Sequence, residues 1–276
     1  MGKKALSMVL VVSLVLTMIV PNLALAASGS SLQDDIWYKT YKQIVAKNNV
    51  TQDLVDVCYN ASDKTFYAIG KNGTLISSSN GNDFGARTDA AITSSTNVDF
   101  VDMYCDGSNI AIAGNEHNTG KTYVFYKSGS GNFSKTELTG ISDASVQAVA
   151  ISGSNIAVMT DKPDYYYSTD SGATWATAAL DPMTGSYTGA SGIAVDPSNG
   201  KFKVYNNSNS KSYQYTFDGQ AGGSWTRGTI TSFRFTTVKN IYRTSNEWLV
   251  LMNNGTASTE YSDYTNGAAA QGRTAN

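Results

Sequence analysis

Histidine, cysteine and proline are scarce in this sequence: its 276 residues include one histidine, two cysteines and four prolines. No cluster of histidine and cysteine has the spacing of a zinc site, and a Ser-His-Asp triad would depend on His117 alone. No calcium loop of the Asp-x-Asp-x-Asp-Gly type is present. Charged residues make up 15% of the chain, and no basic patch offsets the formal net charge of −2, which argues against a nucleic-acid partner. The sequence predicts neither a metal nor a cofactor.

Only one long hydrophobic run occurs, and it lies at the N-terminus. Lys3 and Lys4 precede apolar residues 5–20, and Ala24-Leu25-Ala26 offers small residues where a signal peptidase cleaves. The run is short for a membrane anchor, which needs roughly 20 residues. We interpret residues 1–26 as a secretory signal peptide, with a transmembrane anchor as the alternative. The mature protein is then secreted or held at the cell surface, with no membrane span.

An internal repeat is the main feature of the remaining chain. Strand-like segments resembling Val55-Asp56-Val57-Cys58-Tyr59 recur at intervals of 46, 45, 44 and 48 residues. Each is followed by two further strand-like runs separated by polar turns, a spacing typical of propeller blades. The sequence therefore predicts an all-β fold, with about five repeats of period about 46 over residues 31–265 and a polar tail over 266–276. The recurring segments begin at Val55, Val101, Val146, Ala190 and Val238.

The turn after the third run ends on an aromatic residue. Its best copy is Ser168-Thr169-Asp170-Ser171-Gly172-Ala173-Thr174-Trp175, which resembles the Asp-box (BNR) repeat of sialidase-like propellers. We expect the Asp170 carboxylate to close its own turn, Gly172 to adopt positive φ, and Trp175 to pack on the sheet. Ser168, Asp170, Gly172 and Trp175 are thus structural. The segment Ser78 to Phe84 is a copy one residue shorter.

A fourth strand is predicted after each aromatic residue. Trp37 is in phase with the repeat, whereas the last repeat has only a polar end, so residues 36–45 are predicted to supply its fourth strand. That would close five four-stranded blades into a propeller without exposed sheet edges. Two alternatives remain: an amphipathic helix over residues 31–47, and a chain that is part of a larger propeller.

The two cysteines occupy neighbouring repeats. Cys58 is the fourth residue of its segment and Cys105 the fifth, so strand alternation points them to opposite faces. Opposite faces suit a bridge between neighbouring blades, but equivalent strands can also lie too far apart for a disulfide. The sequence leaves both outcomes open.

Candidate ligand-binding residues lie near the predicted channel mouth. Asp56 and Asp102 hold the same position in adjacent repeats, where they cap strand ends, contact a ligand or act as an acid/base pair. The loops between second and third strands are expected on the same face. The full candidate set is Asp56, Asp102, Gln147, Lys239, Glu116, His117, Asp161 and Asp164.

Sialidase activity is not predicted, although the turn resembles the sialidase repeat. Such enzymes carry an arginine triad and an Arg-Ile-Pro start, and this chain has five arginines and no Arg-Ile-Pro. We favour a binding module for a glycan or another surface polymer, with a protein as a further possible partner. The alternatives are a glycoside hydrolase or lyase using Asp56 and Asp102, and a structural component of a surface assembly.

Overall fold

The structure is a computed structural model that describes residues 50–140, 144–161, 164–179, 190–196, 199–208, 211–217, 226–230, 237–243, 248–253, 258–263 and 271–274. The chain divides into two compact units, Met1–Val50 and Thr51–Asn276. The predicted signal peptide and the predicted strand over 36–45 both lie outside the described residues. No helix among the described residues is long and apolar enough to cross a membrane.

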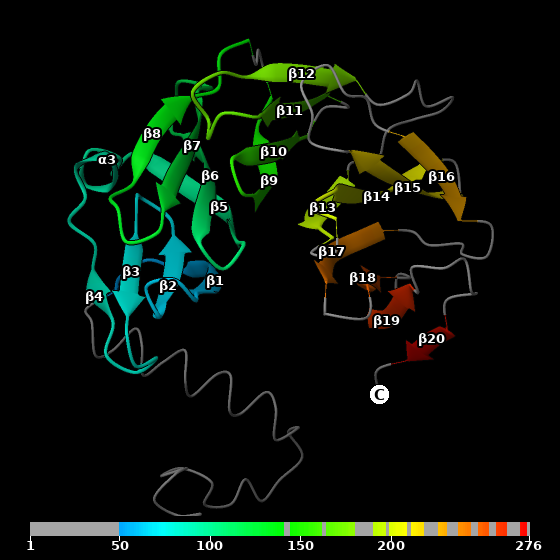
Figure 1. Ribbon diagram of the computed structural model, residues 1–276, viewed down its shortest axis with the longest axis horizontal. Helices are drawn as coiled ribbons and strands as arrows, with labels where there is room; N and C mark the ends of the chain where they lie inside the picture. The colour runs from blue at the N-terminus through cyan, green and yellow to red at the C-terminus, as the bar shows by residue number, and fades with distance from the viewer. Residues whose placement is uncertain are drawn as a thin grey trace, which may run out of the picture. The chain divides into compact units, whose positions relative to one another are not determined.

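The second unit contains five four-stranded antiparallel sheets, each with its strands paired in chain order (Figure 1). Sheet 1 comprises β1 (Leu54–Asn60), β2 (Thr65–Gly70), β3 (Leu75–Ser78) and β4 (Gly85–Ala86). Sheet 2 comprises β5 (Val98–Cys105), β6 (Asn109–Glu116), β7 (Thr122–Ser128) and β8 (Ser134–Glu137). A short helix, α3 (Ala90–Thr93), connects the two.

The remaining sheets repeat this arrangement. Sheet 3 comprises β9 (Val146–Ser152), β10 (Asn155–Thr160), β11 (Asp164–Ser168) and β12 (Ala176–Ala179). Sheet 4 comprises β13 (Ala190–Val195), β14 (Phe202–Ser208), β15 (Lys211–Phe217) and β16 (Thr226–Ile230). Sheet 5 comprises β17 (Thr237–Arg243), β18 (Trp248–Asn253), β19 (Ser258–Asp263) and β20 (Gln271–Thr274). The predicted all-β repeat is therefore confirmed as a series of four-stranded sheets.

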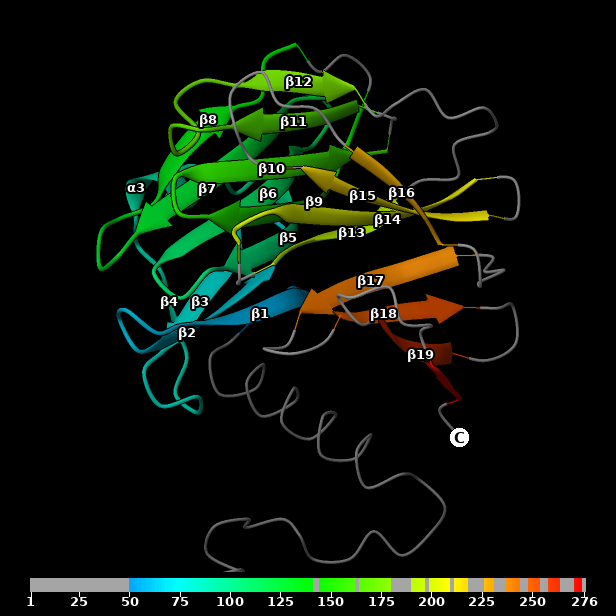
Figure 2. The same cartoon turned by 45° about the vertical axis from the view of Figure 1, so that its right-hand side comes forward.

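The first strands of successive sheets, β1, β5, β9, β13 and β17, contact one another in chain order. We call them the inner strands; Figure 2 shows β9, β13 and β17 side by side. Strand alternation lets each sheet contribute to two cores: Ile110 and Ile112 of β6 pack towards sheet 1, and Ala111 and Ala113 towards sheet 3. The sheets are thus held together mainly by apolar side chains between their faces.

The last sheet corrects one expectation. Its fourth strand is β20, which pairs with β19 and lies within the segment predicted as a polar tail. An outermost strand needs backbone pairing more than an apolar face, so the polar sequence Gln271–Thr274 gave no strand signal. Residues 36–45 are therefore not needed to complete this sheet.

A disulfide joins Cys58 of β1 to Cys105 of β5, with 6.1 Å between the two Cα atoms. Both cysteines border the apolar core between sheets 1 and 2. The structure thus resolves the question that the sequence left open. The inner strands are close enough for side chains of one sheet to bond the next.

A buried ion pair also links sheets 1 and 2. The Lys127 ammonium is 1% exposed and lies 2.7 Å from Asp63 Oδ2, which also accepts a 2.6 Å hydrogen bond from the Tyr67 hydroxyl. Burial would raise the pKa of Asp63, but the hydrogen bonds from Lys127 and Tyr67 outweigh it and lower the pKa below the ordinary value. The lowered pKa favours the ionised form of Asp63 at this contact between the sheets.

The Ser168–Trp175 turn has the geometry that the sequence predicted. Asp170 accepts hydrogen bonds from the backbone N–H of Thr174 at 2.8 Å and from its hydroxyl at 2.6 Å. These bonds lower the pKa of Asp170 to about 2. Gly172 has φ +84°, and Trp175 packs against the core between sheets 2 and 3. In sheet 1, Asn80 closes the corresponding turn.

Candidate functional site

The predicted pair Asp56 and Asp102 bonds backbone groups of the next sheet. Asp56 Oδ2 accepts a 3.0 Å hydrogen bond from the Met103 N–H, and Asp102 Oδ2 accepts one of 2.7 Å from the Val149 N–H. Asp56 Oδ1 also accepts the Val57 N–H at 2.7 Å. Each carboxylate therefore joins one inner strand to the next, which is a structural role.

Burial raises the pKa of both carboxyls. Desolvation is the largest cause that raises the pKa of both carboxyls, and the neighbouring charge of Asp56 raises that of Asp102 further, well above its ordinary value. Two carboxyls with raised pKa values satisfy one requirement of acid/base catalysis. Their backbone hydrogen bonds, however, fix them within the sheet interfaces.

Gln147 and Lys239, which belong to the same candidate set as Asp56 and Asp102, do not occupy the equivalent position of their strands. A β-bulge lies at this point of β1, β5, β9 and β17, so one residue of each strand has no partner on the neighbouring strand. The unpaired residues are Val55, Val101, Gln147 and Lys239. Asp56 and Asp102 follow the bulge by one residue, so their equivalent in β9 is Ala148. A shift of one residue reverses the face of a strand, and Gln147 is accordingly exposed.

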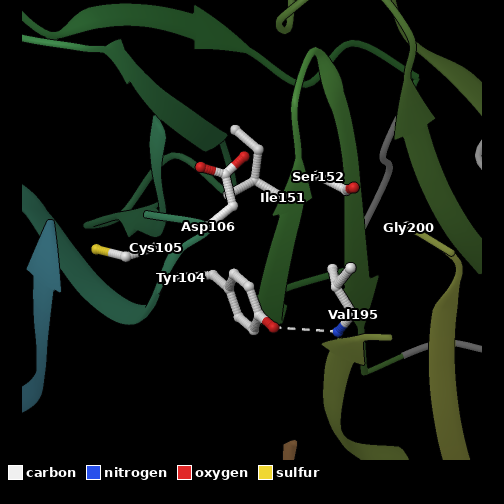
Figure 3. Close-up of a pocket in the computed structure, with 7 residues that line it drawn as sticks. All are labelled: Tyr104, Cys105, Asp106, Ile151, Ser152, Val195 and Gly200. Atoms are coloured by element: carbon white, nitrogen blue, oxygen red, sulfur yellow. Dashed lines mark hydrogen bonds between the residues drawn. The ribbon is translucent and has the colours of Figure 1, made fainter. Parts of the chain in front are cut away.

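A side chain of sheet 2 also bonds sheet 4 directly. The Tyr104 hydroxyl of β5 accepts the Val195 N–H of β13 at 3.2 Å (Figure 3). Burial raises the pKa of Tyr104, so the phenol is neutral.

A pocket of about 300 Å³ lies beside this bond. It is formed where three inner strands end: Cys105 ends β5, Ser152 ends β9 and Val195 ends β13. Figure 3 shows the Tyr104 ring extending from β5 toward Val195, with Asp106 and Ser152 at the same pocket. The lining residues are Tyr104, Cys105, Asp106, Ile151, Ser152, Val195 and Gly200.

The Asp106 carboxylate at this pocket already accepts four hydrogen bonds. Oδ1 accepts the backbone N–H groups of Ser108 and Asn109, at 2.9 and 2.7 Å. Oδ2 accepts the Asn109 side-chain amide at 2.9 Å and the Gly153 N–H of sheet 3 at 2.8 Å. A carboxylate offers about four such positions, so Asp106 has no acceptor position left for a ligand.

The candidate loop residues gather at the opposite ends of the strands. The His117 Nε2 and the Asn72 N–H both lie against Asp99 Oδ1, at 2.8 and 3.0 Å. Burial opposes the effect, but these two contacts lower the pKa of Asp99. Glu116 accepts hydrogen bonds from Thr119 and Asn97, which lower its pKa. Glu116 and His117 thus belong to one ordered polar surface, with Asp99 and Asn72.

The other predicted loop carboxylate that the structure describes, Asp161, is bonded to the backbone. Asp161 Oδ1 accepts the Ser145 N–H at 3.0 Å. Asp164 begins β11 and Lys239 lies in β17, and their side chains are outside the described part of the structure. No three His, Cys, Asp or Glu residues gather as a metal site within the described ranges.

Sequence reasoning missed Tyr104 and Ser152. Aligning the repeats at a constant interval of 46 residues would have found them. That alignment places Ala148 with Asp56 and Asp102, and Ser152 with Asn60 and Asp106. A small residue at a position where other repeats bond the next sheet, such as Ser152, is the signal that could have indicated a pocket.

No protein-family model and no curated protein sequence gives a significant match to this chain. Among solved structures, YCF48 from Cyanidioschyzon merolae matches with a TM-score of 0.55 and 14% identity, covering 78% of this chain and 68% of that one. A structure of YCF48 bound to D1 peptide matches with a TM-score of 0.54 and 16% identity, over 83% and 68% of the two chains. An ancestral GH74 enzyme matches with a TM-score of 0.55 and 16% identity, covering 83% of this chain but 33% of that one. These similarities show a β-propeller scaffold.

Proposed function

We propose that this protein is a secreted or cell-surface binding module on a β-propeller scaffold, which holds a glycan or another surface polymer. The observation that carries the proposal is the bonding of Asp56 and Asp102 to backbone N–H groups of neighbouring sheets. Carboxyls placed in this way hold the scaffold together and are not free to act on a sugar bond. Recognition at the exposed polar surface is the function that remains best supported.

The ligand-binding surface in this proposal is the group Asn72, Asp99, Glu116 and His117. Its side chains are fixed by hydrogen bonds before a ligand arrives, so binding orders few additional groups. It offers donors and acceptors without a dominant positive charge, as suits a hydroxyl-rich polymer. The Asp-box-like turn of Ser168–Trp175 is assigned to the scaffold and not to the site.

An array of glycans and cell-wall polymers tests the proposal with purified protein. We expect a specific hit that His117→Ala or Glu116→Gln weakens at least tenfold. Asn82→Ala is the matched control, because the exposed Asn82 uses only its backbone N–H, in the β3–β4 turn. A blank array from folded protein would overturn the glycan proposal.

A polypeptide ligand is the second candidate. The structure of YCF48 bound to D1 peptide shows that a protein of this general scaffold binds a peptide. In this chain, β1 exposes Val55, Val57 and Tyr59 at 46, 51 and 46%, and alternate apolar side chains of this kind suit an extended peptide. Peptide binding that is lost in Val57→Lys but retained in His117→Ala would favour this function.

The hydrolase alternative has its own test. Release of reducing sugar from a bound polymer, abolished by Asp56→Asn or Asp102→Asn, would establish it. The proposed export is tested by the intact mass of the secreted chain, which should begin at Ala27 or Ser28. Retention of residues 1–26 in the mature protein would contradict export by cleavage.

A further inference from the structure

We propose that the pocket at the ends of β5, β9 and β13 binds one N-acetylhexosamine unit of a neutral glycan, through its acetamido group. This inference rests on the proposed binding function but concerns a different surface from the loop residues around His117. The pocket residues that carry it are Tyr104, Ile151, Ser152 and Val195.

The pocket lies where the third repeat lacks a bridging side chain. In the first repeat, Asn60 Nδ2 donates to Ser108 O of the next sheet at 3.3 Å. In the second, Asp106 accepts from the Gly153 N–H, whereas the third repeat has the shorter Ser152 at this position. Departures from a repeat that bonds its sheets together are expected at functional sites.

The space is kept open beside Ser152 by a glycine. Gly200 has φ +68°, and a Cβ atom built on it would lie 3.0 Å from Ser152 Oγ. A side chain at this position would therefore be strained and would crowd the Ser152 hydroxyl. The absence of a side chain at 200 leaves one wall of the pocket free.

Two hydroxyl groups at the pocket retain unused hydrogen-bonding capacity. Tyr104 accepts the Val195 N–H, which leaves its own proton available to donate. Ser152 Oγ has no hydrogen-bond partner among the described residues, so it can donate and accept. A carbonyl oxygen fits the first group, and a neighbouring amide N–H fits the second.

The pocket lining offers no cation to an anionic ligand. None of its residues is a lysine or arginine, and the four acceptor positions of Asp106 are already used. A carboxylate or phosphate ligand would therefore lose its hydration without a compensating positive charge among the lining residues. A neutral ligand is favoured.

Ile151 and Val195 also border the cavity, but their side chains are 0 and 6% exposed and pack in the cores between the sheets. Recognition therefore depends on the two hydroxyl groups, which suit the amide of an acetamido group. A volume of about 300 Å³ lies at the lower end of the range for ligand pockets, which suits one sugar unit.

Two disaccharides that differ in the acetamido group test the inference. N,N′-diacetylchitobiose and cellobiose share the same linkage and stereochemistry, but the second has hydroxyl groups in place of both acetamido groups. By titration calorimetry on the full protein, we expect N,N′-diacetylchitobiose to bind at least tenfold more tightly than cellobiose. Equal binding of the two, or no binding of either to folded protein, would overturn the inference.

A variant that fills the pocket tests whether the disaccharide binds there. Ser152→Asn gives the third repeat the residue that the first has at position 60, so the fold should tolerate it while the side chain fills the cavity. We expect it to abolish binding of N,N′-diacetylchitobiose without lowering Tm. Ser154→Asn, on an exposed position of the same turn, should bind as the parent does. Undiminished binding by Ser152→Asn would overturn the pocket assignment.

The two proposals fail in different ways. A polymer hit that depends on His117 but is untouched by Ser152→Asn keeps the binding module and removes the pocket inference. Binding of N,N′-diacetylchitobiose that is lost in Ser152→Asn supports the inference even where His117→Ala has no effect, and the loop surface is then the part that is wrong.

Discussion

Replacing Asp102 separates its two roles, as an acceptor for Val149 and as a buried acid. Asp102→Ala leaves the Val149 N–H between sheets 2 and 3 without an acceptor, which costs about 1–3 kcal/mol. For a domain of this size, that loss lowers Tm by roughly 2–12 °C. Asp102→Asn keeps an oxygen for Val149 and removes the charge facing Asp56, so its stability should stay within about 1 kcal/mol of the parent.

The pH dependence gives the second readout. Burial and the charge of Asp56 raise the folded pKa of Asp102 above its ordinary value of 3.8, so the folded state binds the proton more tightly than the unfolded chain. The stabilisation from this group is complete below pH 3.8 and is lost as pH rises through the folded pKa. Asp102→Asn has no such proton, so its stability relative to the parent should improve between pH 4 and pH 7.

Urea unfolding of the parent, Asp102→Asn and Asp102→Ala at three pH values measures both effects. The reasoning would be refuted by equal losses in the two variants, because the oxygen would then not matter. It would also be refuted by a parent and an Asp102→Asn variant whose stabilities change in parallel with pH, because the buried carboxyl would then have no raised pKa.

Three further predictions concern the scaffold. Replacing both Cys58 and Cys105 by serine should destabilise the protein by about 2–4 kcal/mol in denaturant, because the disulfide closes a long loop in the unfolded chain. Asp170→Ala should lower Tm above pH 4 but have little effect near pH 2. Because the folded pKa of Asp170 is lowered to about 2, its stabilisation is present above the pKa of the unfolded chain and is lost as pH falls through about 2. Lys127→Met should cost about 3–5 kcal/mol by leaving Asp63 charged and unpaired, and unfolding titrations measure the loss.

Each of these has a result that contradicts it. Unchanged denaturation midpoints on reduction would show that the disulfide adds no stability. An Asp170→Ala effect that is as large at pH 2 as at pH 7 would mean that the ionised carboxylate is not the stabilising form. A fully stable Lys127→Met protein would place the Asp63 charge in solvent and not between the sheets.

The repeat could be predicted from the sequence because its strands carry strong local signals. Segments such as Thr65–Ile69 and Ile156–Met159 alternate or cluster apolar residues between polar turns, and both lie within strands of the structure, β2 and β10. The Asp170 turn was predictable for the same reason, since every group that closes it lies within eight residues. Local chemistry was sufficient for these features.

The candidate site was predicted less well because it depends on register and on distant contacts. A bulge in each inner strand displaced Gln147 and Lys239 by one position from Asp56, and periodicity alone does not reveal a bulge. The Tyr104–Val195 bond joins residues of two repeats that are not adjacent in sequence. Only the structure brings these groups together.

The most direct test of the binding function uses Asp56→Asn/Asp102→Asn on the polymer that the array identifies. The account predicts that this double variant binds as the parent does, and that the parent releases the polymer unchanged in mass. Shortened polymer from the parent, and intact polymer from the double variant, would contradict the account and identify the two carboxyls as catalytic.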